Sequence, residues 1–187
     1  MPYHSFTTMM KNLLHSLLIT VGGALTAHGQ TARPAGEKAV YQALDRQAHQ
    51  MSQAFISHDY GTFTKLMNPA VIKESGGSAN IEAALVKVDE TMRSQGVKVL
   101  KIDFGAPSRI VRQGNELQCT LPQQTDFQIP SGKIRSTSTL IAVSSDNGVH
   151  WTFIDTSTKD MQAIRKMLPN LSPSIQIHPG GPPVSIP

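Results

Sequence analysis

Three short turns in the second half of the chain constrain its fold more than any other feature. They are Gly114-Asn115, Pro130-Ser131-Gly132-Lys133 and Asp146-Asn147-Gly148, and each separates two segments rich in strand-forming residues. Connections this short join antiparallel neighbours, because a parallel crossover needs about a dozen residues or more. The sequence therefore predicts an antiparallel sheet over residues 97–156.

Six segments in this half have the pattern of extended strands: 97–104, 108–112, 116–121, 126–129, 134–143 and 149–156. Alternation puts Leu117, Cys119 and Leu121 on one face of their strand, which predicts a buried, unreactive thiol. Cys119 is the only cysteine, so no internal disulfide can form. Trp151 and Phe153 likewise share a face.

The segment before the predicted strands has helical periodicity instead. Apolar residues recur at helical spacing within 37–58, 61–67 and 79–95, which predicts three helices. Between the last two, Ala70-Val71-Ile72 is expected to form a short strand. A further short helix is expected after Ser157, which could cap it.

Helices followed by hairpin-linked strands predict an α+β domain over residues 37–169. We expect the three N-terminal helices to pack on one face of a curved, cone-like antiparallel sheet. The short C-terminal helix follows, and then a Pro-rich tail over 170–187 that we expect to be loosely ordered. Residues 30–36 form a short polar linker before the domain. A chain of 187 residues fits about one such domain.

Residues 1–29 have the pattern of a cleavable signal peptide. Lys11 is followed by an apolar run over 13–25, and the small residues Ala27 and Gly29 precede the expected cleavage site. The run is shorter than the roughly 20 apolar residues of a membrane-spanning helix. We therefore expect export to the periplasm or the medium, with no membrane anchor after cleavage. The alternative is a buried N-terminal core helix.

The element order helix, helix, short strand, helix and long hairpins resembles the nuclear-transport-factor-like superfamily, whose cone-shaped fold is shared by ketosteroid isomerases and polyketide cyclases. The segments FISHDYGTFTKLMNPAVIKESGG and SSDNGVHWTFID are similar to those of uncharacterised exported bacterial proteins. The resemblance covers residues 37–156 and implies a cavity inside the cone. It also implies that an isomerase-like base would follow the second helix, near Glu74, with a hydrogen-bond donor from the strands.

Several side chains are candidates for lining that cavity. His58 ends the first helix on its apolar side, although such a residue can equally cap the helix. Trp151 and Phe153 could line a ligand pocket or simply pack in the core. Asp103, Asp126 and Asp155 begin or end strands, where acids are usually solvated. The candidates are Phe55, His58, Tyr60, Glu74, Asp126, Trp151 and Phe153.

The sequence contains no recognisable catalytic, metal-binding or phosphate-binding motif, so we assign no catalytic residue, metal or cofactor. The net charge of +4 is small and its positive residues are scattered, which argues against nucleic acid as a partner. We expect a non-catalytic binding or accessory domain that holds a small apolar ligand or an envelope protein. Two alternatives stay open. One is an interaction protein that forms a homodimer through its sheet face, and the other is a small isomerase- or hydrolase-like enzyme.

Overall fold

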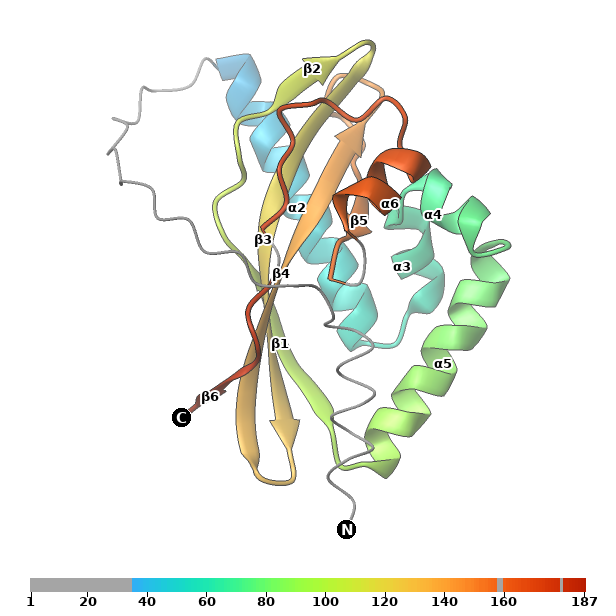
Figure 1. Cartoon of the computed structure of the whole chain (residues 1–187), viewed down its shortest axis with the longest axis vertical. Coiled ribbons are helices and arrows are strands. Elements are labelled where there is room, and N and C mark those ends of the chain that lie inside the picture. The colour runs from blue at the N-terminus through green and yellow to red at the C-terminus, as the bar shows by residue number, and fades with distance from the viewer. Residues whose placement is uncertain (1–34, 158–159, 179) are drawn as a thin grey trace.

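The computed structural model describes residues 35–157, 160–178 and 180–187. These residues form five helices and one six-stranded antiparallel sheet, which confirms the predicted α+β class (Figure 1). The predicted signal peptide over 1–29 and residues 30–34 of the predicted linker lie outside the described residues. None of the helices in the described part has the length and apolar character needed to cross a membrane.

The helices and strands have the following bounds. The helices are α2 (Ala35–Ile56), α3 (Tyr60–Leu66), α4 (Pro69–Glu74), α5 (Ser78–Ser94) and α6 (Met161–Met167). The strands are β1 (Lys98–Phe104), β2 (Val111–Gln113), β3 (Glu116–Ile129), β4 (Gly132–Ser144), β5 (Thr152–Asp155) and β6 (Val184–Ile186).

The sheet is built on the long hairpin of β3 and β4, and it does not close into a barrel. β1 and β2 pair with successive parts of β3, while β5 and β6 pair with successive parts of β4. All of these pairings are antiparallel, as the short turns predict.

β3 runs unbroken through Pro122, although the sequence predicts two strands separated by a gap. The carbonyl of Pro122 accepts a hydrogen bond from the backbone N–H of Gly105 at 2.9 Å, just beyond the end of β1. The proline nitrogen faces the same edge, between the parts of β3 that pair with β1 and with β2. Because no ladder bond is needed there, the missing N–H does not interrupt the strand.

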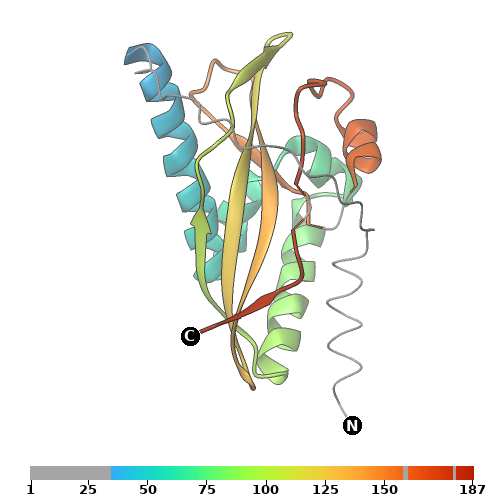
Figure 2. The ribbon, with the colours of Figure 1, turned by 60° about the vertical axis from the view of Figure 1, so that its left-hand side comes forward.

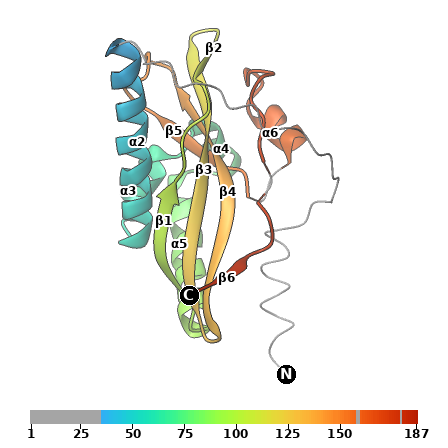
Figure 3. The same cartoon turned by 90° about the vertical axis from the view of Figure 1, so that its left-hand side faces the viewer.

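The main core lies between α2 and one face of the sheet. Leu44 and Ala48 of α2 pack there against residues from β3, β4 and β5, including Leu121, Leu140 and Phe153. Figure 3 shows α2 and α3 on this side of the sheet. The predicted helical stripe of α2 is therefore its core-facing side.

The register predicted for Cys119 is confirmed. The thiol is fully buried and belongs to the main core with Leu121, and partly buried Leu117 packs against it. Burial raises the pKa of Cys119 to about 12. Gln118, on the other face of the strand, is also buried and reaches the adjacent layer through the backbone of Ser172.

The short strand predicted at Ala70-Val71-Ile72 is wrong, because this segment lies in helix α4. Asn68 caps the helix by accepting a hydrogen bond from the backbone N–H of Ala70 at 3.0 Å, and Pro69 occupies the first turn. Both are strong helix-start signals, and they outweigh the strand preference of the two β-branched residues. From residue 35 to the sheet, the structure therefore has four helices, where the sequence predicts three.

Helices lie on both faces of the sheet, and not only on the face where the three N-terminal helices are expected to pack. Ile141, Val143 and Ile154 point to the face opposite the main core, where they pack with Ile164 of α6 and Ile175 of the tail. Figures 2 and 3 show α6 and the tail on this side, away from α2. The tail is thus part of the packed structure, and its end forms β6 beside β4.

Candidate functional site

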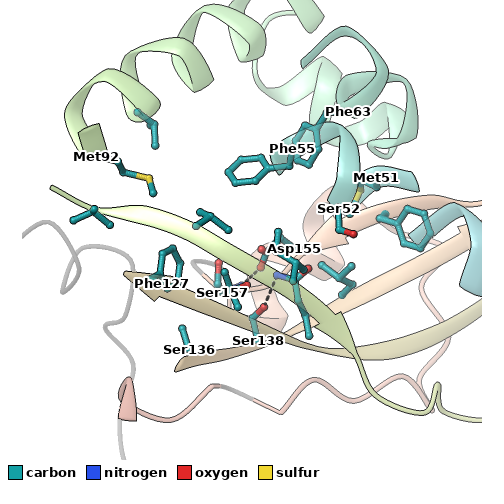
Figure 4. A pocket seen from close by; sticks show the side chains of 18 of the residues that line it. Met51, Ser52, Phe55, Phe63, Met92, Phe127, Ser136, Ser138, Asp155 and Ser157 are labelled. Atoms are coloured by element: carbon teal, nitrogen blue, oxygen red, sulfur yellow. Dashed lines mark hydrogen bonds between the residues drawn. The ribbon is translucent and has the colours of Figure 1, made fainter. Parts of the chain in front are cut away.

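The main cavity lies between α2, α3 and α5 on one side and the sheet on the other (Figure 4). Its volume is about 310 Å³, within the usual range for small-molecule sites, about 300–1,000 Å³. The helices contribute an apolar roof that includes Met51, Phe55, Phe63 and Met92, while the strands contribute the floor.

The floor is set by the pairing of β3 with β4. Gln123 lies opposite Ser138, and Thr125 lies opposite Ser136, so four polar side chains face the cavity together. The Nε2 of Gln123 donates a hydrogen bond to the Oγ of Ser138 at 3.2 Å. The next inward pair, Phe127 and Ile134, is apolar. A ligand here would meet a hydrogen-bonding strip between apolar walls.

Helix α5 stands apart from the sheet over much of its length. Ile81, at its start, is buried, but Val88 is 43 % exposed although both belong to the same apolar stripe. Val88 and Met92 border the cavity. The stripe of α5 therefore faces open space instead of packed core.

Asp155, the last residue of β5, is the only ionisable side chain among the described residues that line the main cavity. Its Oδ1 accepts a hydrogen bond from the backbone N–H of Ser157 at 2.7 Å. Desolvation nevertheless raises the pKa of the Asp155 carboxyl, against the lowering effect of the hydrogen bonds from Ser157. Asp155 nevertheless keeps an exposed surface while it borders the cavity, so both solvent and a bound ligand can reach it.

A side hollow of about 340 Å³ adjoins the main cavity. The two share the wall residues Phe55, Val88, Met92, Val97 and Val99. The outer rim of the hollow is polar and includes His58, Tyr60, Asp89, Arg93 and Lys98.

The rim residues bind one another. The Nδ1 of His58 lies 3.0 Å from the phenol oxygen of Tyr60 and 3.5 Å from Oδ1 of Asp89. Arg93 forms an ion pair with Asp89 one helical turn away. Desolvation and the charge of Asp89 raise the pKa of Tyr60. These contacts anchor the end of α2 to α5, so the cluster has a structural role at the edge of the cavity.

The structure brings some of the predicted site residues together and separates others. Phe55 and Phe153 line the main cavity, and Phe55, His58 and Tyr60 line the side hollow. Glu74, Asp126 and Trp151 line neither space.

Each of these three residues has a different position. Trp151 is buried in the main core, and its backbone N–H bonds Gln47. Asp126 faces away from the cavity and forms a bidentate pair with Arg135, whose hydrogen bonds lower the pKa of Asp126. Glu74 is exposed at the end of α4.

The sequence considerations missed Asp155 as a cavity residue. It lies two residues after Phe153, and residues two apart in a strand share a face. That spacing was the signal available, but acids at strand ends are normally solvated. The polar floor was missed as well, since Ser136 and Ser138 carry no motif.

The described residues contain no group of three or more His, Cys, Asp and Glu side chains arranged to hold a metal ion. Comparison of the chain with protein-family models, with curated proteins and with solved structures gives no match.

Proposed function

We propose that this protein is a non-catalytic binding module that holds a small, largely apolar ligand in the main cavity. The observation that carries the proposal is the cavity itself, with its apolar roof, its polar floor strip and Asp155 at its edge. Empty apolar space is costly, because its lining forgoes the contacts that a packed core provides. A ligand between Val88 of α5 and the sheet would supply those contacts.

The proposal also concerns the compartment in which the protein binds its ligand. The signal-peptide pattern of residues 1–29 supports export, so the ligand would be bound in the periplasm or outside the cell. The element order supports a cone-shaped fold of the nuclear-transport-factor-like type, in which helices roof a curved sheet. α4 departs from the order on which that resemblance rests, since a helix stands where a short strand is expected.

A cavity-filling substitution tests the proposal. Val88→Trp adds a large side chain at a position that borders both the main cavity and the side hollow and is not packed in the core. We expect it to weaken binding of Nile red, a neutral apolar dye whose fluorescence rises on burial, by about tenfold or more. The fold should persist, since Val88 is 43 % exposed.

Val86→Trp is the matched control. Val86 lies on the same helix and is 44 % exposed, but it borders neither space. It should bind the dye as the wild type does. If wild type and both variants bind Nile red equally, or if none binds it, the proposed function is wrong.

A small isomerase- or hydrolase-like enzyme is the second candidate, and Asp155 favours it. A carboxyl with a raised pKa inside a cavity is typical of catalytic acids and bases. No second ionisable group lines the main cavity among the described residues, however, and this weighs against acid–base catalysis by a pair. The test is conversion of any bound compound by wild type and its loss in Asp155→Asn.

Dimerisation through the sheet face has less support. α6 and the tail cover much of the face opposite the cavity, including Ile141, Val143 and Ile154.

A further inference from the structure

We propose that the ligand of the main cavity is an organic cation, a protonated amine on an apolar body, and that its ammonium group pairs with Asp155. This inference rests on the proposed function, since it names the chemical class of the ligand that the cavity holds.

The first observation is that Asp155 forms no ion pair with a Lys, Arg or His of the described residues. Within that part of the chain, its carboxylate accepts the 2.7 Å hydrogen bond from the Ser157 N–H. Acids elsewhere in the fold do have such partners, as Asp126 has Arg135 and Asp89 has Arg93. A ligand cation would give the Asp155 carboxylate the charged partner that the described residues do not supply, beside walls that are largely apolar.

The second observation is the aromatic lining. Phe55, Phe63, Phe127 and Phe153 all border the same cavity. The rings of Phe55 and Phe63 are tilted, with centroids 5.4 Å apart. Figure 4 shows these two rings across the cavity from Asp155. Aromatic faces attract alkylammonium groups, and the attraction is stronger where water is excluded.

The rest of the lining fits the body of such a ligand. Met51, Met67 and Met92 are flexible and polarisable, so they adapt to an irregular apolar shape. Gln123 and Ser138 can accept hydrogen bonds from the remaining N–H groups of an amine. An anionic ligand would instead meet the like charge of Asp155.

Three probes of similar size distinguish the ligand classes. Phenethylamine, phenethyl alcohol and phenylacetate share a phenyl ring and differ in charge. We expect the amine to bind wild type about tenfold tighter than the alcohol or more, with phenylacetate weakest, in titrations followed by NMR or calorimetry. Because the ammonium group should bind the ionised carboxylate more tightly than the protonated acid, saturating amine should lower the pKa of Asp155. A tenfold difference in affinity between the two forms corresponds to about one pKa unit, so we expect a decrease of about one unit or more.

Asp155→Asn removes the charge while keeping the shape. In this variant the amine should lose its advantage over the alcohol, and binding of the alcohol should stay within about twofold of wild type. Asp103→Asn is the matched control, because it removes one carboxylate from the same sheet at a position that borders neither space. It should keep the preference for the amine. A carboxyl-detected pH titration of wild-type Asp155, with and without amine, gives a readout that needs no variant.

Each other outcome overturns the inference. Equal binding of amine and alcohol, or an amine preference that survives Asp155→Asn, contradicts it while leaving the apolar-ligand proposal intact. If phenylacetate binds most tightly, the inference is wrong, and the carboxylate of the ligand would instead bind Arg93 and Lys98 at the side hollow. If none of the three probes and no Nile red binds, the proposed function fails, and this inference with it.

Discussion

The side-chain oxygen of Gln47 on α2 accepts a hydrogen bond from the backbone N–H of Trp151 at 2.9 Å, across 104 positions of sequence. The amide nitrogen of the same side chain donates to the carbonyl of Val149 at 2.8 Å. Gln47 thus binds the chain at two points just before β5 begins at Thr152. It joins the first helix to the strand that ends at Asp155.

Replacement of Gln47 by methionine should destabilise the fold. Methionine has a similar size but cannot pair with the buried N–H of Trp151, and a buried unpaired backbone group costs about 1–3 kcal/mol. We expect a loss of that size in the free energy of unfolding by urea. Gln53→Met on the exposed side of the same helix is the control and should change it by less than about 0.5 kcal/mol. Equal effects at both positions would show that helix propensity, and not the cross-link, is responsible.

Cys119 should resist alkylation in the folded protein. Its thiol is fully buried and has a pKa of about 12, so it forms almost no thiolate at neutral pH. Reaction with iodoacetamide should follow the rate of unfolding, and Cys119→Ala should cost on the order of 1 kcal/mol by leaving a small void. Rapid labelling under native conditions would contradict the burial.

The charge of Asp155 should lower the stability of the ligand-free protein. Its pKa is raised from 3.8 on folding, so between 3.8 and the higher folded value the native state binds more protons than the unfolded state. Stability should therefore fall as the pH rises through that interval and stay lower above it. Asp155→Asn should remove this fall and be more stable than wild type at neutral pH. Urea unfolding at a series of pH values measures the effect, and a wild-type profile that rises with pH where the Asn variant is flat would contradict it.

Local patterns predicted much of the fold because short turns leave few ways to connect strands. The turns at Gly114-Asn115 and Pro130-Ser131 are enough to give the antiparallel order around β3 and β4. Errors occurred where two local signals compete, as at α4, where Asn68 and Pro69 favour a helix and Val71-Ile72 a strand. The covered outer face also had a signal: Leu140 to Val143 form a continuous apolar run, and such runs are typical of strands buried on both sides.

The cavity was harder to predict, because it forms where side chains do not fill the space between the helices and the sheet. Phe55 and Phe153 could be singled out as apolar residues that face inward, yet no pattern tells a wall of a cavity from a packed core. That distinction depends on how far α5 stands from the sheet, which is set by contacts remote in sequence, such as the bond from the Thr64 hydroxyl to Glu82 at 3.0 Å.

The tail should contribute to stability, and Ile175 tests this. Its side chain is 3 % exposed and packs with Ile141, Val143 and Ile154 on the outer face of the sheet. Ile175→Ala should cost about 2–5 kcal/mol, because it removes buried methyl groups and leaves a cavity. Val184→Thr, at a tail position that is 56 % exposed, keeps the branched side chain of β6 and should change stability by less than about 0.5 kcal/mol. Since the tail and the main cavity lie on opposite faces, Ile175→Ala should leave Nile red affinity unchanged wherever the protein remains folded. Loss of stability by both substitutions alike, or by neither, would show that the tail does not pack on the sheet through Ile175.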